Sequence, residues 1–228
     1  MSRTVLDDLM RSPLLEGTDL RALRELDLRP RARTLAPGQL LFDRDDASLD
    51  VHFVLDGRLL AVLRDAEGRE LLFSQIAPGG HLGELSAIDG QQRSLSVYAQ
   101  TEARVITIAQ EEFRRLIEAC PTVRDAVMRH LVTMIRKLTI RSYETAAMTV
   151  EDRLRAYLVR LATEHGALTG SATIHDAPSH SEIASVIGSN REAVSRAVSM
   201  LKRSGIIEAG RRRFRILAPD VLMAGLVP

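Results

Sequence analysis

The segment 179–202 constrains the fold most strongly, because two short helical patterns lie on either side of one glycine. Ser179 and Glu182 have the spacing of a capping box, in which each side chain accepts a hydrogen bond from the other residue's backbone N–H. The apolar residues that follow share one helical face: Ile183, Val186 and Ile187. Gly188 comes next, and glycine often ends a helix because it adopts the left-handed conformation without strain. We therefore expect a short capped helix that ends in a tight turn.

A second helix is predicted directly after this turn. Ser189 and Glu192 repeat the capping spacing. One face of the helix has the i, i+3, i+4, i+7 spacing of buried residues: Val194, Ala197, Val198 and Leu201. The opposite face is polar: Arg191, Glu192, Ser195, Arg196, Ser199 and Lys202. Two short helices joined in this way form a helix-turn-helix.

The polar face of the second helix is chemically suited to read DNA bases. A guanidinium can hold guanine O6 and N7 with two hydrogen bonds, and a carboxylate can accept one from cytosine N4. Arg191, Glu192 and Arg196 are therefore predicted base readers. The alternative is a solvated face, on which Glu192 closes the helix cap and pairs with Arg196 four residues later.

The sequence after this helix favours the DNA-reading interpretation. Residues 205–217, GIIEAGRRRFRIL, predict two short strands, a turn at Gly210 and three arginines at the tip that could reach phosphates. From Glu151 onward there are eleven Arg and Lys against eight Asp and Glu, although the net charge of the chain is only +1. We predict a winged helix-turn-helix DNA-binding domain over 149–228. Its expected DNA contacts are Ser179, His180, Asn190, Arg191, Glu192, Ser195, Arg196 and Arg212.

Residues 33–108 show a different pattern, in which short apolar runs alternate with turn residues. The runs are QLLF, VHFVL, RLLAVLR, ELLFSQI, SLSVYA and RVITIA. The glycines between them are Gly38, Gly57, Gly68, Gly80 and Gly90. Short strands at this spacing predict an antiparallel sandwich or barrel of jelly-roll type. A short amphipathic helix with a Thr18 cap is expected before them, over 14–27, so that the whole β-domain spans 1–120.

After Pro121 turn residues are absent for almost thirty positions, and the sequence predicts one long helix over 121–148. One apolar stripe contains Val127, Leu131, Met134 and Leu138. A second stripe, one residue later, contains Met128, Val132, Ile135 and Thr139. A helix with two adjacent faces of this kind can pack against its own domain and against a twin helix, which indicates a parallel homodimer. The alternative is a core helix of a monomer.

The boundary between the long helix and the C-terminal domain is expected near Met148. Thr149 and Asp152 have the spacing of a helix cap directly after it. Residues 166–178 have no periodic pattern and are interpreted as a connector. Three histidines near this connector have spacings that match no tight metal-ligand motif: His165, His175 and His180. We therefore expect no metal ion.

The composition excludes several classes of protein. The 228 residues contain one cysteine, Cys120, which excludes an intrachain disulfide framework and a four-cysteine zinc or iron–sulfur site. No apolar run approaches about 18 residues, and the N-terminus has no cleavable apolar core, so we expect a cytoplasmic protein without a membrane partner. Walker, nucleophile-elbow, H-E-x-x-H and dinucleotide motifs are missing from the sequence, so no enzymatic activity is predicted.

The β-domain contains one pattern that suits a buried phosphate. Gly83-Glu84-Leu85 is followed by Arg93-Ser94. An arginine, a hydroxyl and a turn of backbone N–H groups can neutralise and hydrogen-bond an anion, and a carboxylate suits a sugar hydroxyl. The alternative is an ordinary surface turn. His81, just before this pattern, is expected to be a partly buried loop histidine with a backbone partner rather than a ligand contact or pH sensor.

The order of these features resembles the cyclic-AMP receptor protein and FNR family of bacterial regulators over nearly the whole chain. The resemblance implies an α+β fold with a jelly-roll cyclic-nucleotide-binding domain, a long dimerisation helix and a C-terminal winged helix-turn-helix. It implies a phosphate-binding cassette, with Glu84 on the ribose hydroxyl and Arg93 on the cyclic phosphate: Gly83, Glu84, Leu85, Arg93 and Ser94. The Arg191-Glu192…Arg196 trio resembles the base-reading pattern of the family, which implies palindromic DNA with half-sites of the TGTGA kind.

The resemblance further implies a cyclic-nucleotide-responsive transcription regulator that contacts RNA polymerase. In family members that bind cyclic AMP, two adjacent hydroxyl residues on the long helix contact the purine, and a gapless match back from Arg153 puts Leu138 and Thr139 there. Because Leu138 cannot hydrogen-bond, cyclic AMP and cyclic GMP are both candidate effectors. Haem and iron–sulfur branches are not expected, since the cassette is intact and N-terminal cysteines are missing. The alternatives are a ligand-independent or cyclic di-GMP-responsive regulator of this family, and a cyclic-nucleotide-binding adaptor that acts on a protein partner.

Overall fold

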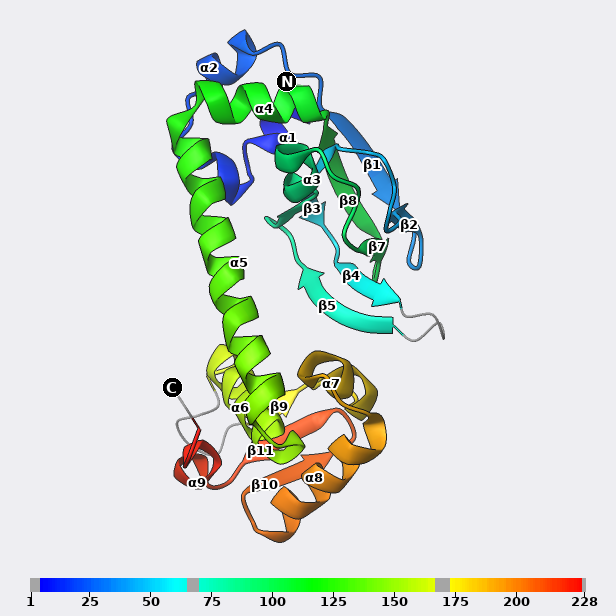
Figure 1. Cartoon of the computed structure of the whole chain (residues 1–228), viewed down its shortest axis with the longest axis vertical. Coiled ribbons are helices and arrows are strands. Elements are labelled where there is room, and N and C mark those ends of the chain that lie inside the picture. The colour runs from blue at the N-terminus through cyan, green and yellow to red at the C-terminus, as the bar shows by residue number, and fades with distance from the viewer. Residues whose placement is uncertain (1–4, 65–69, 167–172, 227–228) are drawn as a thin grey trace. The chain divides into compact units, whose positions relative to one another are not determined.

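The computed structural model describes residues 5–64, 70–166 and 173–226. Residue contacts divide the chain into two compact units, Met1–Ile135 and Arg136–Pro228, and the long helix contributes to both. The predicted α+β class is confirmed, because each unit combines antiparallel sheet with helices (Figure 1). The predicted domains, 1–120, 121–148 and 149–228, instead give this helix a segment of its own, and that division stays a prediction.

The first unit contains two four-stranded antiparallel sheets that form the predicted sandwich. One sheet has the order β1 (Arg31–Leu35), β8 (Ala103–Ile108), β3 (Val51–Asp56) and β6 (His81–Leu82). The other has the order β2 (Leu40–Phe42), β7 (Ser96–Ala99), β4 (Leu59–Arg64) and β5 (Glu70–Ile76). All six predicted strands are present. The sequence missed β1, a largely exposed edge strand without apolar alternation, and β6, which has only two residues.

Strand β3 is buried on both faces, because it lies between two hydrophobic clusters. Val51 and Phe53 belong to a cluster that the N-terminal helices and the start of the long helix complete. Val54 belongs to a second cluster between the two sheets, where it joins Leu59 and Val105. The strand is therefore held rigidly, and it forms one wall of the cassette region through its pairing with β6.

The N-terminal helices differ in detail from the single predicted helix. Three short helices are present: α1 (Val5–Leu9), the 3-10 helix η1 (Pro13–Leu15) and α2 (Leu20–Glu25). The predicted Thr18 cap is wrong, since Asp19 caps α2 by accepting a hydrogen bond from the Arg21 N–H at 2.9 Å. Leu23 is fully buried, whereas Leu20 and Leu26 are partly buried.

Helix α5 (Pro121–Ala147) confirms the predicted long helix, and α4 (Gln110–Ala119) precedes it. In the first unit, Val127 is buried in the cluster beneath β3. The second stripe is exposed there, with exposed fractions of 58% at Met128, 46% at Val132 and 63% at Ile135. Among the described residues, no helix combines the length and apolarity that crossing a membrane requires.

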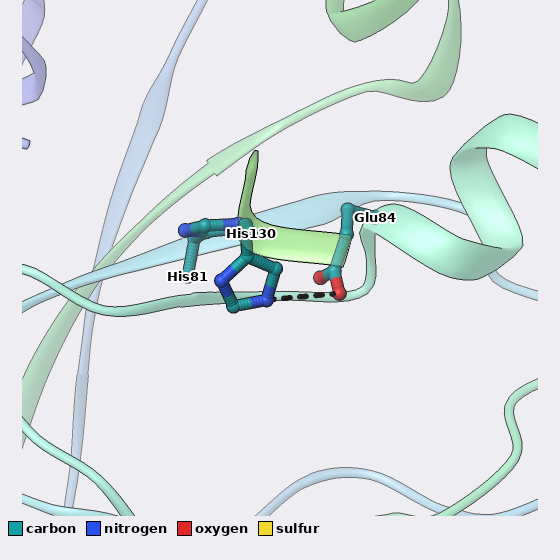
Figure 2. A group of neighbouring side chains, drawn as sticks. All are labelled: His81, Glu84 and His130. Atoms are coloured by element: carbon teal, nitrogen blue, oxygen red, sulfur yellow. Dashed lines mark ion pairs between the residues drawn. The ribbon is translucent and has the colours of Figure 1, made fainter. Parts of the chain in front are cut away.

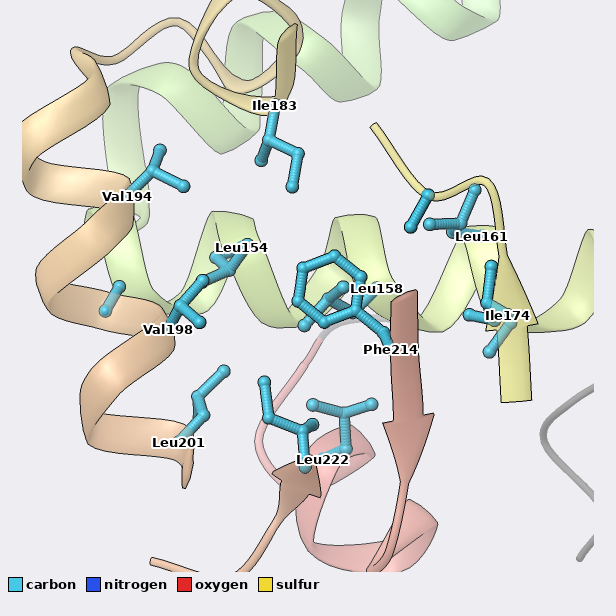
Figure 3. Packing of buried hydrophobic residues seen from close by; sticks show 14 of the residues in the cluster. Leu154, Leu158, Leu161, Ile174, Ile183, Val194, Val198, Leu201, Phe214 and Leu222 are labelled. Atoms are coloured by element: carbon cyan, nitrogen blue, oxygen red, sulfur yellow. The ribbon is translucent and has the colours of Figure 1, made fainter. Parts of the chain in front are cut away.

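The second unit packs four helices and a three-stranded sheet around one core (Figure 3). Its elements are α6 (Val150–Glu164), β9 (Thr173–His175), α7 (His180–Ile187), α8 (Arg191–Arg203), β10 (Ile207–Gly210), β11 (Arg213–Ile216) and α9 (Pro219–Met223). Leu154 and Leu158 of α6 are fully buried, and Thr149 caps α6 as predicted. The connector prediction is wrong for Thr173–His175, which pair with β11. Three residues are too few to show a strand period.

Candidate functional site

Arg93 is almost completely enclosed, with 2% of its surface exposed. Its Nη2 donates to the Asp50 carbonyl at 2.7 Å, and its Nη1 donates to the Gly83 carbonyl at 3.2 Å. Nε and Nη2 both donate to the Ser48 hydroxyl, and the guanidinium lies 4.3 Å from the centroid of the Phe42 ring. All these partners are neutral groups, so the described structure holds a buried guanidinium without a carboxylate in direct contact.

This enclosed charge makes the Arg93 region suited to an anion. Burial lowers the pKa of the guanidinium, although the nearby charges of Asp50, Asp46 and Glu84 act against that effect. The carboxylate of Asp50 pairs instead with Arg31, at 3.7 Å. A buried charge is costly unless an opposite charge compensates it, so an anionic ligand on Arg93 would be stabilised.

Gly83 is required by the backbone next to Arg93. Its φ of +91° lies in the left-handed region, which glycine adopts freely. A Cβ at this position would lie 2.6 Å from Arg93 Nη1 and 2.6 Å from the Asp50 carbonyl oxygen. The glycine therefore turns the chain from β6 into the short helix α3 (Glu84–Asp89) and lets the guanidinium approach the backbone.

Glu84 and Ser94, the other polar side chains of the predicted cassette, differ strongly in exposure. Glu84 is 3% exposed, and its Oε1 lies 3.7 Å from His130 Nε2 of α5 (Figure 2). Burial alone would raise the pKa of Glu84, but contacts with His130 and His81 bring it below its ordinary value, so the carboxylate is ionised. Ser94 is exposed, as is 41% of Leu85. The structure thus brings Gly83, Glu84 and Arg93 together and leaves Ser94 and Leu85 facing outward.

His81 is partly buried as predicted, but the rest of its predicted environment is wrong. It lies in strand β6, where it pairs with Phe53, rather than in a loop. Among the described residues, its Nε2 is buried without a hydrogen-bond partner, and the centroid of its ring lies 4.3 Å from that of the His130 ring. The contact with His130 could not be predicted from the spacing of the histidines in the sequence, because only the tertiary structure brings α5 next to β6.

Residues 43–50, which connect β2 to β3, contribute to the Arg93 site. Besides the Ser48 and Asp50 contacts, the backbone N–H of Arg93 donates to the carbonyl of Asp46. His52 follows this segment in strand β3. It is 7% exposed, and its Nδ1 lies 2.8 Å from Thr107 Oγ1. Burial and the charge of Arg93 lower the pKa of His52 to about 3, so the ring is neutral at physiological pH.

Leu138 and Thr139 lie on α5 in the second unit. Leu138 is 40% exposed, and Thr139 is also exposed. Leu138 lines a shallow concavity on this side of the helix with Arg141, Ser142, Thr145 and Ala146. Their expected contact with the nucleotide stays a prediction.

The helix-turn-helix is formed by α7 and α8. Ser179 and Glu182 form the predicted capping box, and Gly188 ends α7 in the left-handed conformation. The predicted Ser189 cap is wrong: the Asn190 side chain caps α8 by accepting from the Ala193 N–H at 2.8 Å. Helix α8 therefore begins at Arg191, one residue later than a Ser189 cap predicts, and the Ser189 N–H bonds to the Ala184 carbonyl of α7.

The exposed face of α8 is free of the ion pair that the alternative interpretation requires. Arg191, Glu192 and Arg196 are exposed, and they line one open concavity with Ser195, Ser199, Met200, Lys202 and Arg203. In the described part of the chain, no ion pair joins Glu192 to Arg196, and Asn190 rather than Glu192 supplies the cap. The opposite face is buried at all four predicted positions. His180, at the start of α7, is partly buried.

The predicted wing is present as the hairpin of β10 and β11, but its turn lies one residue later than expected. Gly210 pairs with Arg213 in the ladder, so Arg211 and Arg212 form the two-residue tip. Arg212 has φ +51°, and its side chain is exposed. The sequence missed the contribution of Arg153, whose buried side chain donates from Nη1 to the Gly188 carbonyl and thereby links α6 to the helix-turn-helix.

Family models and relatives match both units. A cyclic nucleotide-binding domain model matches residues 32–120, and a Crp-like helix-turn-helix domain model matches residues 152–224. The cAMP-activated global transcriptional regulator CRP of Escherichia coli O157:H7 is 30% identical over 173 residues, which cover 74% of this chain and 81% of that protein. The CRP-like cAMP-activated global transcriptional regulator of Mycobacterium tuberculosis is 25% identical over 201 residues, covering 87% and 89%.

Solved structures agree with this fold. FixK2 from Bradyrhizobium japonicum has a TM-score of 0.69 at 18% identity and covers 86% of this chain and 96% of its own. The c-di-GMP responsive regulator CLP of Xanthomonas campestris has a TM-score of 0.72 at 20% identity and covers 87% and 99%. A buried arginine beside a left-handed glycine, a winged helix-turn-helix and these matches together place the chain in the CRP-like family of cyclic nucleotide-binding transcription regulators.

Proposed function

We propose that this protein is an allosteric regulator in which a cyclic purine nucleotide, cyclic AMP or cyclic GMP, controls sequence-specific DNA binding. The buried guanidinium of Arg93, which no carboxylate contacts directly in the described structure, carries this proposal, since a cyclic phosphate would bring a negative charge into direct contact with it. Glu84, ionised and enclosed close by, can accept hydrogen bonds from a ribose hydroxyl. The exposed hydroxyl of Ser94 is available to the same phosphate, and Leu138 and Thr139 are the proposed contacts to the base.

Calorimetric titration with cyclic AMP, cyclic GMP and cyclic di-GMP tests the nucleotide. One of the two cyclic mononucleotides should bind, and Arg93→Gln should weaken that binding by about 10- to 150-fold, the loss expected for charge-assisted hydrogen bonds. Arg58→Gln is the matched control, because Arg58 is an exposed arginine of the same unit. Binding of cyclic di-GMP alone would favour the alternative of a cyclic di-GMP-responsive regulator of the same family. Heats indistinguishable from buffer for all three nucleotides would favour a ligand-independent regulator.

We assign base reading to Arg191, Glu192 and Arg196 of α8, and phosphate contact to Arg212 at the wing tip. The exposure of these side chains and the lack of a Glu192–Arg196 pair in the described structure support this division. Arg196→Ala should lose about 1–3 kcal/mol of discrimination at one base pair. Arg212→Ala should weaken binding to all sequences equally and lower the slope of log K against log salt by about 1. An affinity for DNA that does not change with salt would instead favour the adaptor alternative.

Helix α5 is the proposed homodimer contact. Met128, Val132 and Ile135 form an exposed apolar row, which is costly in water and complementary to a copy of itself across a two-fold axis. Val132→Lys should shift the sedimentation coefficient of the protein to that of a monomer. Thr133→Lys is the matched control, because Thr133 lies on another face of the same turn. An unchanged dimer in Val132→Lys, or a monomeric wild type, would contradict this assignment.

The two sites are proposed to be coupled as a switch. A nucleotide can change DNA affinity only by the ratio of its own affinities for the two conformations of the protein, and the coupling is reciprocal. Operator DNA should therefore tighten nucleotide binding by the same factor by which the nucleotide tightens DNA binding. Equal nucleotide affinities with and without operator DNA would contradict the switch. We also propose that the protein acts in the cytoplasm and that RNA polymerase is one of its partners.

A further inference from the structure

Three side chains meet at the cassette: His81 of β6, Glu84 of α3 and, from a distant part of the sequence, His130 of α5 (Figure 2). Each offers one metal-ligating atom, and these atoms lie within 4.8 Å of one another. His130 Nε2 is 3.7 Å from Glu84 Oε1, and the two imidazole rings are 4.3 Å apart between centroids. The bonds that zinc forms with histidine and carboxylate, about 2.0–2.1 Å long, put tetrahedral ligands about 3.4 Å apart. The separation of His130 Nε2 and Glu84 Oε1 therefore needs to contract by about 0.3 Å, and no pair of ligand atoms needs to approach by more than about 1.4 Å.

Two atoms of this group lack the partners that buried polar atoms require. His81 Nε2 and Glu84 Oε2 are buried without a hydrogen bond in the described structure. Glu84 is 97% enclosed, and an unpartnered buried polar atom is costly. An ion at this position would satisfy both atoms at once.

We infer that His81, Glu84 and His130 bind a divalent transition-metal ion of the Zn²⁺ class. Two imidazole nitrogens and one carboxylate oxygen suit such an ion, whereas Mg²⁺ and Ca²⁺ prefer oxygen ligands only. Three protein ligands leave a fourth position open for water or another ligand. His81 and Glu84 are held rigidly by β6 and by the turn at Gly83, and the His130 side chain, 36% exposed, can move to close the site. The sequence alone predicted no metal, because its histidine spacings gave no indication that α5 meets β6.

The site shares Glu84 with the proposed nucleotide pocket but does not require a nucleotide. The metal test is therefore made on nucleotide-free, tag-free full-length protein, so its result does not depend on the proposed effector. Calorimetry with Zn²⁺ should give one ion per chain, and Co²⁺ should give the visible absorption bands of a four- or five-coordinate ion with nitrogen and oxygen ligands. Thiolate charge-transfer bands should be missing, because Cys120 is not part of the group.

Variants separate this site from adventitious binding. Loss of second-shell groups alone weakens metal affinity about 10- to 100-fold, so loss of a direct ligand in His130→Ala should weaken Zn²⁺ binding by at least about tenfold. His81→Phe keeps the ring packing against Phe53 and should have a similar effect. His175→Ala is the matched control, because His175 is an exposed histidine on β9. Circular dichroism and melting temperature in the absence of metal check that each variant is folded.

The outcomes decide the inference directly. Stoichiometric Co²⁺ bands that disappear in His130→Ala and in His81→Phe, and persist in His175→Ala, support it. Missing bands in the wild type overturn it. Zn²⁺ affinities that are the same in the wild type, His130→Ala and His81→Phe also overturn it, because the ion would then be bound by other residues.

Discussion

Acidification should destabilise the N-terminal unit through His52. Its ring is 7% exposed, lies against Phe42 and contacts Thr107 Oγ1, and burial with the charge of Arg93 lowers its pKa from 6.5 to about 3. The unfolded chain therefore takes up this proton near pH 6.5, whereas the folded chain takes it up only near pH 3. Stability due to the neutral ring is complete above pH 6.5 and is lost as the pH falls from 6.5 to about 3.

The size of this effect follows from the two pKa values. At about 1.36 kcal/mol per pH unit, the free energy of unfolding should fall by about 2 kcal/mol between pH 6.5 and pH 5, and by roughly 5 kcal/mol by pH 3. His52→Asn keeps a polar atom near Thr107 without a titrating group. The stability advantage of the wild type over this variant, measured by urea denaturation, should be about 2 kcal/mol smaller at pH 5 than at pH 7.5.

Two measurements can refute this reasoning. Parallel stability profiles of the wild type and His52→Asn between pH 7.5 and pH 5 would show that the ring contributes nothing to the pH dependence. An NMR titration in which the His52 Cε1–H signal moves with a midpoint near 6.5 would show that burial does not hold the ring neutral. His175→Asn is the control, because His175 is exposed and lies in the other unit.

Three further predictions concern the backbone, the core and a helix cap. Gly83→Ala should cost more than Gly90→Ala in urea denaturation, because both glycines have positive φ but only Gly83 has atoms 2.6 Å from an added Cβ; equal losses would contradict the steric argument. Leu158→Ala, which empties a fully buried position, should lower the unfolding free energy of the second unit by about 2–5 kcal/mol, and a loss below 1 kcal/mol would contradict tight packing there. Ser179→Ala should cost about 0.5–2 kcal/mol and make the amides at the start of α7 exchange faster with solvent, since Glu182 alone would remain of the capping box.

The helix-turn-helix could be predicted in detail because its signals are local. Caps and apolar periodicity act within a few residues, so Ser179, Glu182 and the buried face of α8 are visible in the sequence. Where two neighbouring residues can both serve as a cap, the sequence cannot choose between them. Asn190 rather than Ser189 caps α8, and the Ser189 N–H bonds to the Ala184 carbonyl in the turn that ends α7.

The structure of two connecting segments could not be predicted, because it depends on the distant residues that they contact. Thr173–His175 become a strand only because β11 offers an open edge, and a three-residue segment carries no period of its own. The segment 43–50 carries four acidic residues in sequence, yet its Ser48 hydroxyl and its Asp50 carbonyl accept hydrogen bonds from Arg93. Hydrogen bonds between segments more than forty residues apart leave no regular spacing in the chain.

The sequence by itself determined the order of the domains, the long helix, the jelly-roll strands and the chemistry of Arg93, Glu84 and the α8 face, because periodicity, caps and motifs are short-range properties. Only the tertiary structure decided that Arg93 is buried among neutral partners, that Ser94 faces outward, and that His130 meets His81 and Glu84. The physical reason is that burial and charge compensation depend on which distant segments pack together, and this packing sets both the cost of an unpaired group and the ligand that can relieve it.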